Sequence, residues 1–159
     1  MRYVTTVLTA ASLSACQTVS SPESSKAEVQ QAIQDWASSV NNCNSEKISS
    51  LYSPEAVLWG TIAPTIISSP AGIRQYFDQV CSTNPPLKVA LGEQRLRVYD
   101  NFAVNSGSYT ITVFAAGQAR QLPARYSFSY QRQGGKWLVV DHHSSLLPTP
   151  PAPASAPGR

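Results

Sequence analysis

The chain has 159 residues, of which 42% are hydrophobic and 13% are charged, and its formal net charge is +3. This length provides for one domain with a single core. The basic residues are scattered along the chain without a run or a stripe, which argues against a nucleic-acid partner.

Residues 1–15 are typical of an export signal. Arg2 precedes a short apolar run, and the run leads into Leu13-Ser14-Ala15-Cys16. This stretch resembles a bacterial lipoprotein signal, in which cleavage before the cysteine is followed by acylation of its thiol. We therefore expect a lipid on Cys16 to anchor an exported protein on the periplasmic side of the cell envelope, at the outer membrane. An ordinary secretory signal with an incidental Cys16 is the alternative.

Residues 16–24 are rich in serine and are expected to form a flexible tether. A first helix is predicted from Ser25, a suitable N-cap because Glu28 follows in the capping-box position. Apolar residues then recur at the spacing of an amphipathic helix, at Val29, Ala32, Ile33, Trp36, Ala37 and Val40. A second, short helix is predicted between Ser45 and Pro54, with three buried residues, Ile48, Leu51 and Tyr52.

A short hairpin is predicted from residues 56–61 and 65–68. A third helix is predicted to begin at Pro70 with Ser69 as its N-cap, because proline fits the first helical position. From Leu87 onward, apolar and polar residues alternate with the period of a strand. We therefore expect four strands joined as consecutive antiparallel hairpins, over residues 87–100, 101–117, 121–135 and 136–145.

Three helices followed by a meander predict an α+β fold, with the helices on one face of a curved, mainly antiparallel sheet. This order, together with "PEAVLWG", "PAGIRQYFDQ" and "GGKWLVVDHHSSLLP", resembles the nuclear transport factor 2-like superfamily of cone-shaped domains. Within it, the chain is similar to the association domain of calcium/calmodulin-dependent protein kinase II and its SnoaL-like bacterial relatives. The domain is assigned to residues 25–147, and residues 148–159 form a proline-rich tail without an apolar period.

The resemblance implies a pocket at the wide end of the cone and self-association through the outer sheet face, as a homodimer or a larger ring. It does not imply kinase activity, because the chain has no glycine-rich loop and no "HRD" or "DFG" motif. In kinase association domains an arginine follows the histidine of the last strand, whereas Ser144 follows His143 here. Arg74 keeps a basic residue on the third helix. We therefore expect a small molecule in the pocket and leave its identity open.

Both histidines of the chain lie in "KWLVVDHHSS", residues 136–145. Strand alternation places Asp141 and His143 on one face and His142 on the other. We interpret Asp141 and His143 as hypothetical acid/base groups that point into the pocket, where a carboxylate poises an imidazole near neutral pH. The alternative is structural, with His143 bonded to a neighbouring strand or helix end and Asp141 paired with Arg125.

Candidate ligand-binding residues are the aromatic and basic side chains expected near the pocket, namely Trp59, Arg74, Tyr76, Tyr109, Arg125, Tyr126 and His143. No metal and no cofactor are expected, because histidines on opposite faces of a strand cannot chelate one ion and no other histidine is present. Two functions stay open. One is a non-catalytic binding or assembly module, and the other is a SnoaL-like isomerase, cyclase or hydrolase that uses Asp141 and His143.

Cys43 and Cys81 are the two cysteines that follow Cys16. An even number of cysteines in an exported protein favours a disulfide. We therefore predict that a Cys43–Cys81 bond links the end of the first helix to the end of the third.

Overall fold

The structure is a computed structural model that describes residues 21–115 and 117–148. The predicted signal peptide, the lipid site at Cys16 and the tail from Thr149 onward lie outside these residues. The elements follow one another as α1 (Pro22–Asn41), α2 (Ser45–Ser49), β1 (Tyr52–Trp59), α3 (Pro70–Val80), β2 (Lys88–Tyr99), β3 (Phe102–Ala115), β4 (Gln118–Gln133) and β5 (Lys136–Leu146). Within the described part of the chain, no helix is long and apolar enough to cross a membrane.

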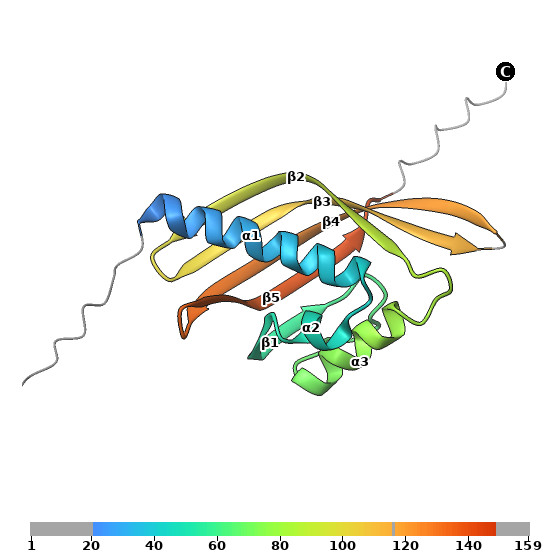
Figure 1. The fold of residues 1–159 in the computed structure, drawn as a ribbon, viewed down its shortest axis with the longest axis horizontal. Helices are drawn as coiled ribbons and strands as arrows, with labels where there is room; N and C mark the ends of the chain where they lie inside the picture. The colour runs from blue at the N-terminus through green and yellow to red at the C-terminus, as the bar shows by residue number, and fades with distance from the viewer. Residues whose placement is uncertain (1–20, 116, 149–159) are drawn as a thin grey trace, which may run out of the picture.

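A single five-stranded sheet has the order β1-β5-β4-β3-β2. The last four strands form the predicted antiparallel meander, and β1 joins the opposite edge in parallel with β5. Figure 1 shows α1 crossing the hollow side of the curved sheet, with α2 and α3 gathered beside β1. The predicted α+β class, with three helices on a curved and mainly antiparallel sheet, is confirmed.

The first helix starts earlier than predicted. Ser21 caps α1 by accepting a hydrogen bond from the Ser24 amide, and Pro22 occupies the first turn, so part of the predicted tether is helical. The predicted cap, Ser25, is buried inside the helix. Glu28 has a different role from the predicted one, because its carboxylate accepts a hydrogen bond from the Trp137 indole at 2.9 Å and so joins α1 to β5.

The second helix and the strand after it also differ from expectation. Helix α2 ends at Ser49, and Tyr52 starts β1 instead of closing the helix. The predicted hairpin is reduced to one bridge between Leu58 and Ile67, because β1 pairs along β5 instead. The third helix is as predicted, since Ser69 caps it and Pro70 occupies its first turn.

A β-bulge in β5 decides which side chains face the helices. Tyr130 of β4 pairs with Val139, whereas the preceding residue, Ser129, pairs with Asp141. Val140 is therefore an extra residue, and the alternation of faces reverses after it. As a result Val139 and His142 both face the core, although residues three positions apart on a regular strand face opposite sides.

The core lies between α1, α3 and the hollow side of the sheet, and Trp36 is at its centre. The Trp36 ring packs edge-on against Phe77, Phe128 and His142, with ring centroids 6.4, 5.1 and 5.5 Å away. Since Trp36 and Phe77 come from α1 and α3, this cluster joins both helices to the sheet.

Candidate functional site

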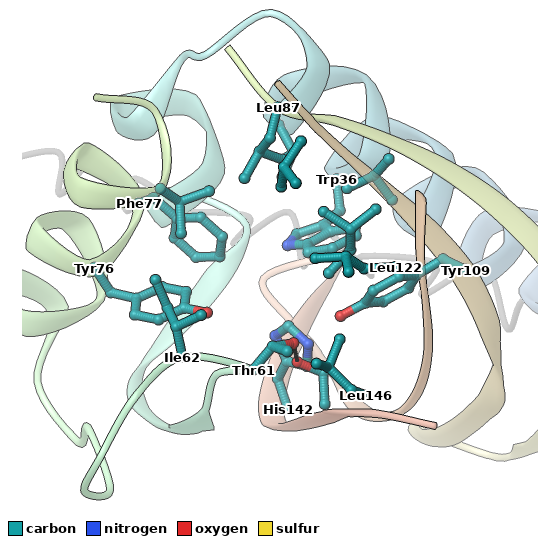
Figure 2. Close-up of a pocket in the computed structure, with 16 residues that line it drawn as sticks. Trp36, Thr61, Ile62, Tyr76, Phe77, Leu87, Tyr109, Leu122, His142 and Leu146 are labelled. Carbon is teal, nitrogen blue, oxygen red and sulfur yellow. Dashed lines mark hydrogen bonds between the residues drawn. The ribbon is translucent and has the colours of Figure 1, made fainter. Parts of the chain in front are cut away.

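A cavity of about 150 Å³ lies beside this aromatic cluster, between the helices and the sheet. Most of its wall is apolar, with Trp36, Val40, Phe77 and Val80 from the helices. The sheet supplies the facing apolar residues Val89, Ile111, Val113, Leu122 and Leu146. Figure 2 shows side chains from both sides of this space, among them Trp36, Phe77 and Leu122. Such a wall favours an apolar occupant, and an engineered apolar cavity of similar volume accepts benzene.

The rim of the cavity is formed by apolar side chains that remain in contact with solvent. Ile62, in the loop after β1, is 59% exposed, and Leu146, at the end of β5, is 46% exposed. Exposed aliphatic residues at a cavity mouth are consistent with the entry of a small apolar molecule.

Five polar residues interrupt the apolar wall: Thr61, Tyr76, Tyr109, His142 and Ser144. The Thr61 and Ser144 hydroxyls are 2.6 Å apart and hydrogen-bond each other. Burial raises the pKa of Tyr76 to about 12. It also raises the pKa of Tyr109, and the neighbouring hydroxyls of Ser144 and Thr61 offset part of that rise. Both phenols are therefore protonated at neutral pH.

His142 is the most strongly perturbed polar group of the wall. Its side chain is only 2% exposed, and its ring stacks on Phe128 with a centroid separation of 3.9 Å. Burial, with a smaller contribution from His143, lowers the pKa of His142 to about 3. The imidazole is therefore neutral at physiological pH.

Two buried residues hold the His142 ring in place. The Tyr52 hydroxyl lies 2.8 Å from Nδ1 of His142, and the Trp36 indole donates a hydrogen bond to the same hydroxyl at 3.1 Å. Nε2 of His142, in contrast, is buried and has no hydrogen-bond partner among the described residues. The other buried polar atoms without partners, Asn105 Oδ1 and the hydroxyls of Tyr126 and Tyr130, belong to residues that do not line the cavity.

The structure brings two of the predicted ligand-binding residues, Tyr76 and Tyr109, to the cavity wall. Tyr126 is not part of the wall, because it stacks behind Tyr109 with ring centroids 5.4 Å apart. Arg74 and Arg125 are exposed and lie away from the cavity, so the prediction that they line it is wrong. Arg74 points away because Ile73 and Phe77 form the buried stripe of α3.

The prediction that Asp141 and His143 face the pocket is also wrong. Both side chains are exposed on the outer face of the sheet, because the extra residue Val140 reverses the alternation on which the prediction rested. Trp59 pairs in register with His143 and lies on the same outer face, where it is 45% exposed. These three residues therefore share a surface, but it is the surface opposite the cavity.

Sequence reasoning missed His142 as a cavity residue, together with Trp36, Thr61 and Ser144. Trp36 belongs to the apolar stripe of the first helix, and such a stripe by itself predicts a core residue and not a cavity residue. Thr61 and Ser144 carry no pattern that distinguishes them from loop and strand residues.

The two described cysteines lie side by side where they were predicted to meet. Cys43 follows the end of α1, Cys81 caps the end of α3, and both are free thiols in the structure. Burial raises the pKa of Cys81 to about 12, and hydrogen bonding to Cys43 adds to the rise. The disulfide between them stays a prediction. No group of three or more histidine, cysteine, aspartate or glutamate side chains that suits a metal ion occurs in residues 21–115 and 117–148.

Residues 25–148 match the family model of the calcium/calmodulin dependent protein kinase II association domain. A solved structure from Xanthomonas campestris, assigned to the same association domain, is 32% identical, with a TM-score of 0.70 over 76% of this chain and 86% of that one. A calcium/calmodulin-dependent protein kinase II hub homology domain from Chlamydomonas reinhardtii is 19% identical, with a TM-score of 0.64 over 78% of this chain and 98% of that one.

A nuclear transport factor 2-like protein from Streptomyces avermitilis, described as a dehydratase, is 14% identical, with a TM-score of 0.73 over 80% of this chain and 99% of that one. At this identity the likeness shows the fold alone, and it confirms the predicted nuclear transport factor 2-like architecture. No curated protein matches the chain in sequence.

Proposed function

Because the chain belongs to the calcium/calmodulin-dependent protein kinase II association domain family, we propose that it is a self-associating module that binds a small molecule in the cavity beneath α1 and α3. The matched region is the association domain and not the catalytic domain of these kinases. In this proposal the module is exported and is held at the outer membrane through a lipid on Cys16. Labelling cells with a fatty acid tests the anchor, because Cys16→Ser abolishes the label if the lipid is on that thiol.

The observation that carries the proposed binding function is the open apolar cavity of about 150 Å³. An open space with polar groups at only a few points is typical of a ligand site.

The cavity favours binding over acid/base catalysis. The cavity wall contains no carboxylate, and Asp141 and His143 lie on the opposite face of the sheet. His142 is neutral and Tyr76 is protonated at neutral pH, since their pKa values are about 3 and about 12. Neither group exchanges a proton readily in the range where general acid/base catalysis is efficient.

Self-association is supported by the family and by the outer face of the sheet. Trp59, His143, Ser127 and Ser106 form a row across four neighbouring strands. A large exposed aromatic side chain within a polar surface is common at interfaces between protein subunits. The hydroxyl groups of this row tolerate solvent, so Trp59 is the residue on which the interface is expected to depend.

Binding in the cavity is tested by filling it. Thermal unfolding is followed with benzene-sized neutral probes, such as cyclohexanone and benzaldehyde, and with benzoate as a charged comparison. A probe at one hundred times its Kd stabilises the protein by about 2.7 kcal/mol. Val113→Phe places a ring in the cavity and should abolish this stabilisation, whereas Thr112→Phe, on the adjacent outward-facing position, should preserve it. If no neutral probe stabilises the protein, or if Val113→Phe has no effect, the proposed binding function is wrong.

A further inference from the structure

If the cavity binds a small molecule as proposed above, the hydrogen bonding of His142 indicates the chemical class of that molecule. Figure 2 shows the His142 ring among the side chains that line the cavity. Its Nε2 atom is the only buried polar atom of the cavity wall without a partner among the described residues. Whether this atom donates or accepts a hydrogen bond decides which ligands can satisfy it.

The hydrogen bonds on the other side of the ring determine the tautomer. The Trp36 indole can only donate, so the Tyr52 oxygen accepts that bond. If the Tyr52 hydroxyl donates to Nδ1 of His142, the Trp36 and Tyr52 protons both have acceptors, and only the proton on Nε2 lacks one among the described residues. If Nδ1 carried the proton instead, the Tyr52 hydroxyl proton would be buried without an acceptor among the described residues. The first arrangement leaves one buried polar group of the three residues without a partner, whereas the second leaves two, the Tyr52 proton and the bare Nε2. We therefore take Nδ1 as the acceptor and place the proton on Nε2.

The cavity therefore presents one uncharged donor in an apolar wall. None of the residues that line it is a lysine, arginine, aspartate or glutamate. A charged ligand would lose its hydration without gaining an ion pair, which strongly disfavours carboxylates, phosphates and amines. An acceptor oxygen on an uncharged ligand, in contrast, completes the hydrogen bonding of His142.

We propose that the cavity binds an uncharged, mostly apolar molecule of about the size of benzene, whose carbonyl oxygen accepts a hydrogen bond from Nε2 of His142. Tyr52 does not line the cavity and acts as a positioning residue, because its hydrogen bond to Nδ1 fixes the proton on Nε2. The apolar wall binds the hydrocarbon part, and the single donor selects for the oxygen.

The first test needs no ligand. In the full chain labelled with 15N at histidine, long-range couplings to the ring carbons identify which nitrogen of His142 carries the proton at pH 7. We expect a protonated Nε2 and a bare Nδ1 in the unaltered chain, and a mixture of both tautomers in Tyr52→Phe. A proton on Nδ1 of the unaltered chain overturns the proposal.

The second test compares cyclohexanone with methylenecyclohexane, which have the same ring and differ in an oxygen or a methylene group. His142→Phe should weaken binding of cyclohexanone roughly fivefold to tenfold more than binding of methylenecyclohexane, the effect of about one neutral hydrogen bond. His143→Phe, which alters the exposed neighbouring residue, should change neither affinity. The carbonyl stretch of bound cyclohexanone should lie at lower frequency in the unaltered chain than in an apolar solvent.

The outcomes separate this inference from the function on which it rests. If neither probe binds the unaltered chain, the proposed small-molecule site is wrong and the inference fails with it. If both probes bind and His142→Phe weakens them equally, the site stands and the inference is overturned. If His142→Phe does not fold, the tautomer and the carbonyl stretch of the unaltered chain still decide, because an unshifted stretch overturns the proposal.

Discussion

Burial of a neutral histidine makes the stability of this fold depend on pH in a way that can be calculated. The ordinary pKa of a histidine is 6.5, and burial lowers the pKa of His142 to about 3 in the folded protein. Below pH 6.5 the unfolded chain takes up a proton at this site that the folded chain excludes. Stability is therefore fully present above pH 6.5 and is lost as the pH falls from 6.5 toward 3.

The expected loss is about 1.4 kcal/mol for each pH unit in this window, and so about 2 kcal/mol between pH 7 and pH 5. Urea unfolding at pH 7, 6 and 5 measures it. His142→Phe removes the titrating group while keeping a ring that stacks on Phe128, so the free energy of unfolding of this variant should fall by about 2 kcal/mol less over the same range. Other groups titrate equally in both proteins and cancel in the difference.

His143→Gln is the matched control for this measurement. His143 is exposed on the outer face of the sheet, so its replacement should leave most of the pH dependence in place. The reasoning is refuted if the unaltered chain and His142→Phe lose the same stability between pH 7 and pH 5. It is also refuted if His142 is found by NMR to titrate between pH 5 and pH 8.

Three further predictions concern other parts of the molecule. Free-thiol titration of the denatured, unreduced protein should find neither Cys43 nor Cys81, and two reactive thiols would contradict the disulfide. Under oxidising conditions, Cys43→Ser should lower the free energy of unfolding by about 4 kcal/mol in the chain-entropy account. Trp59→Ala should weaken self-association at least 30-fold, the equivalent of about 2 kcal/mol for a central interface residue; unchanged sedimentation would remove Trp59 from the interface. Asp141→Asn and His143→Gln should leave the binding of cyclohexanone unchanged, because both residues lie outside the cavity, and a loss of binding in either variant would contradict the assignment of faces.

Local signals predicted the elements of this fold well because they depend on neighbouring residues. Ser69-Pro70 identifies the start of α3, since a cap and a first-turn proline act within one turn of the helix. The same signal is present at Ser21-Pro22, where it marks the start of α1. The capping box at Ser25 and Glu28 predicts a later start for α1 than Ser21-Pro22 does, and the structure follows Ser21-Pro22.

The site was less predictable because it depends on how distant strands pair. The stretch from Trp137 to Ser144 reads as one alternating strand, and nothing in it marks Val140 as an extra residue. The bulge becomes apparent only when β5 is aligned with β4, where Ser129 and Tyr130 take partners two positions apart. One unpredicted residue was enough to exchange the faces assigned to His142 and His143.

The bulge also places the two histidines of one short strand at the sites of the two proposed functions. His142 faces the cavity, where Tyr52 and Trp36 fix its ring, and His143 faces the outer surface beside Trp59. The two histidines are adjacent in sequence, yet the sheet separates their surroundings. Ligand binding should therefore respond to changes at His142 and self-association to changes around Trp59. If instead substitution of Trp59 altered both properties together, the cavity and the outer face would be coupled through β1 and β5, which carry these residues as paired neighbours.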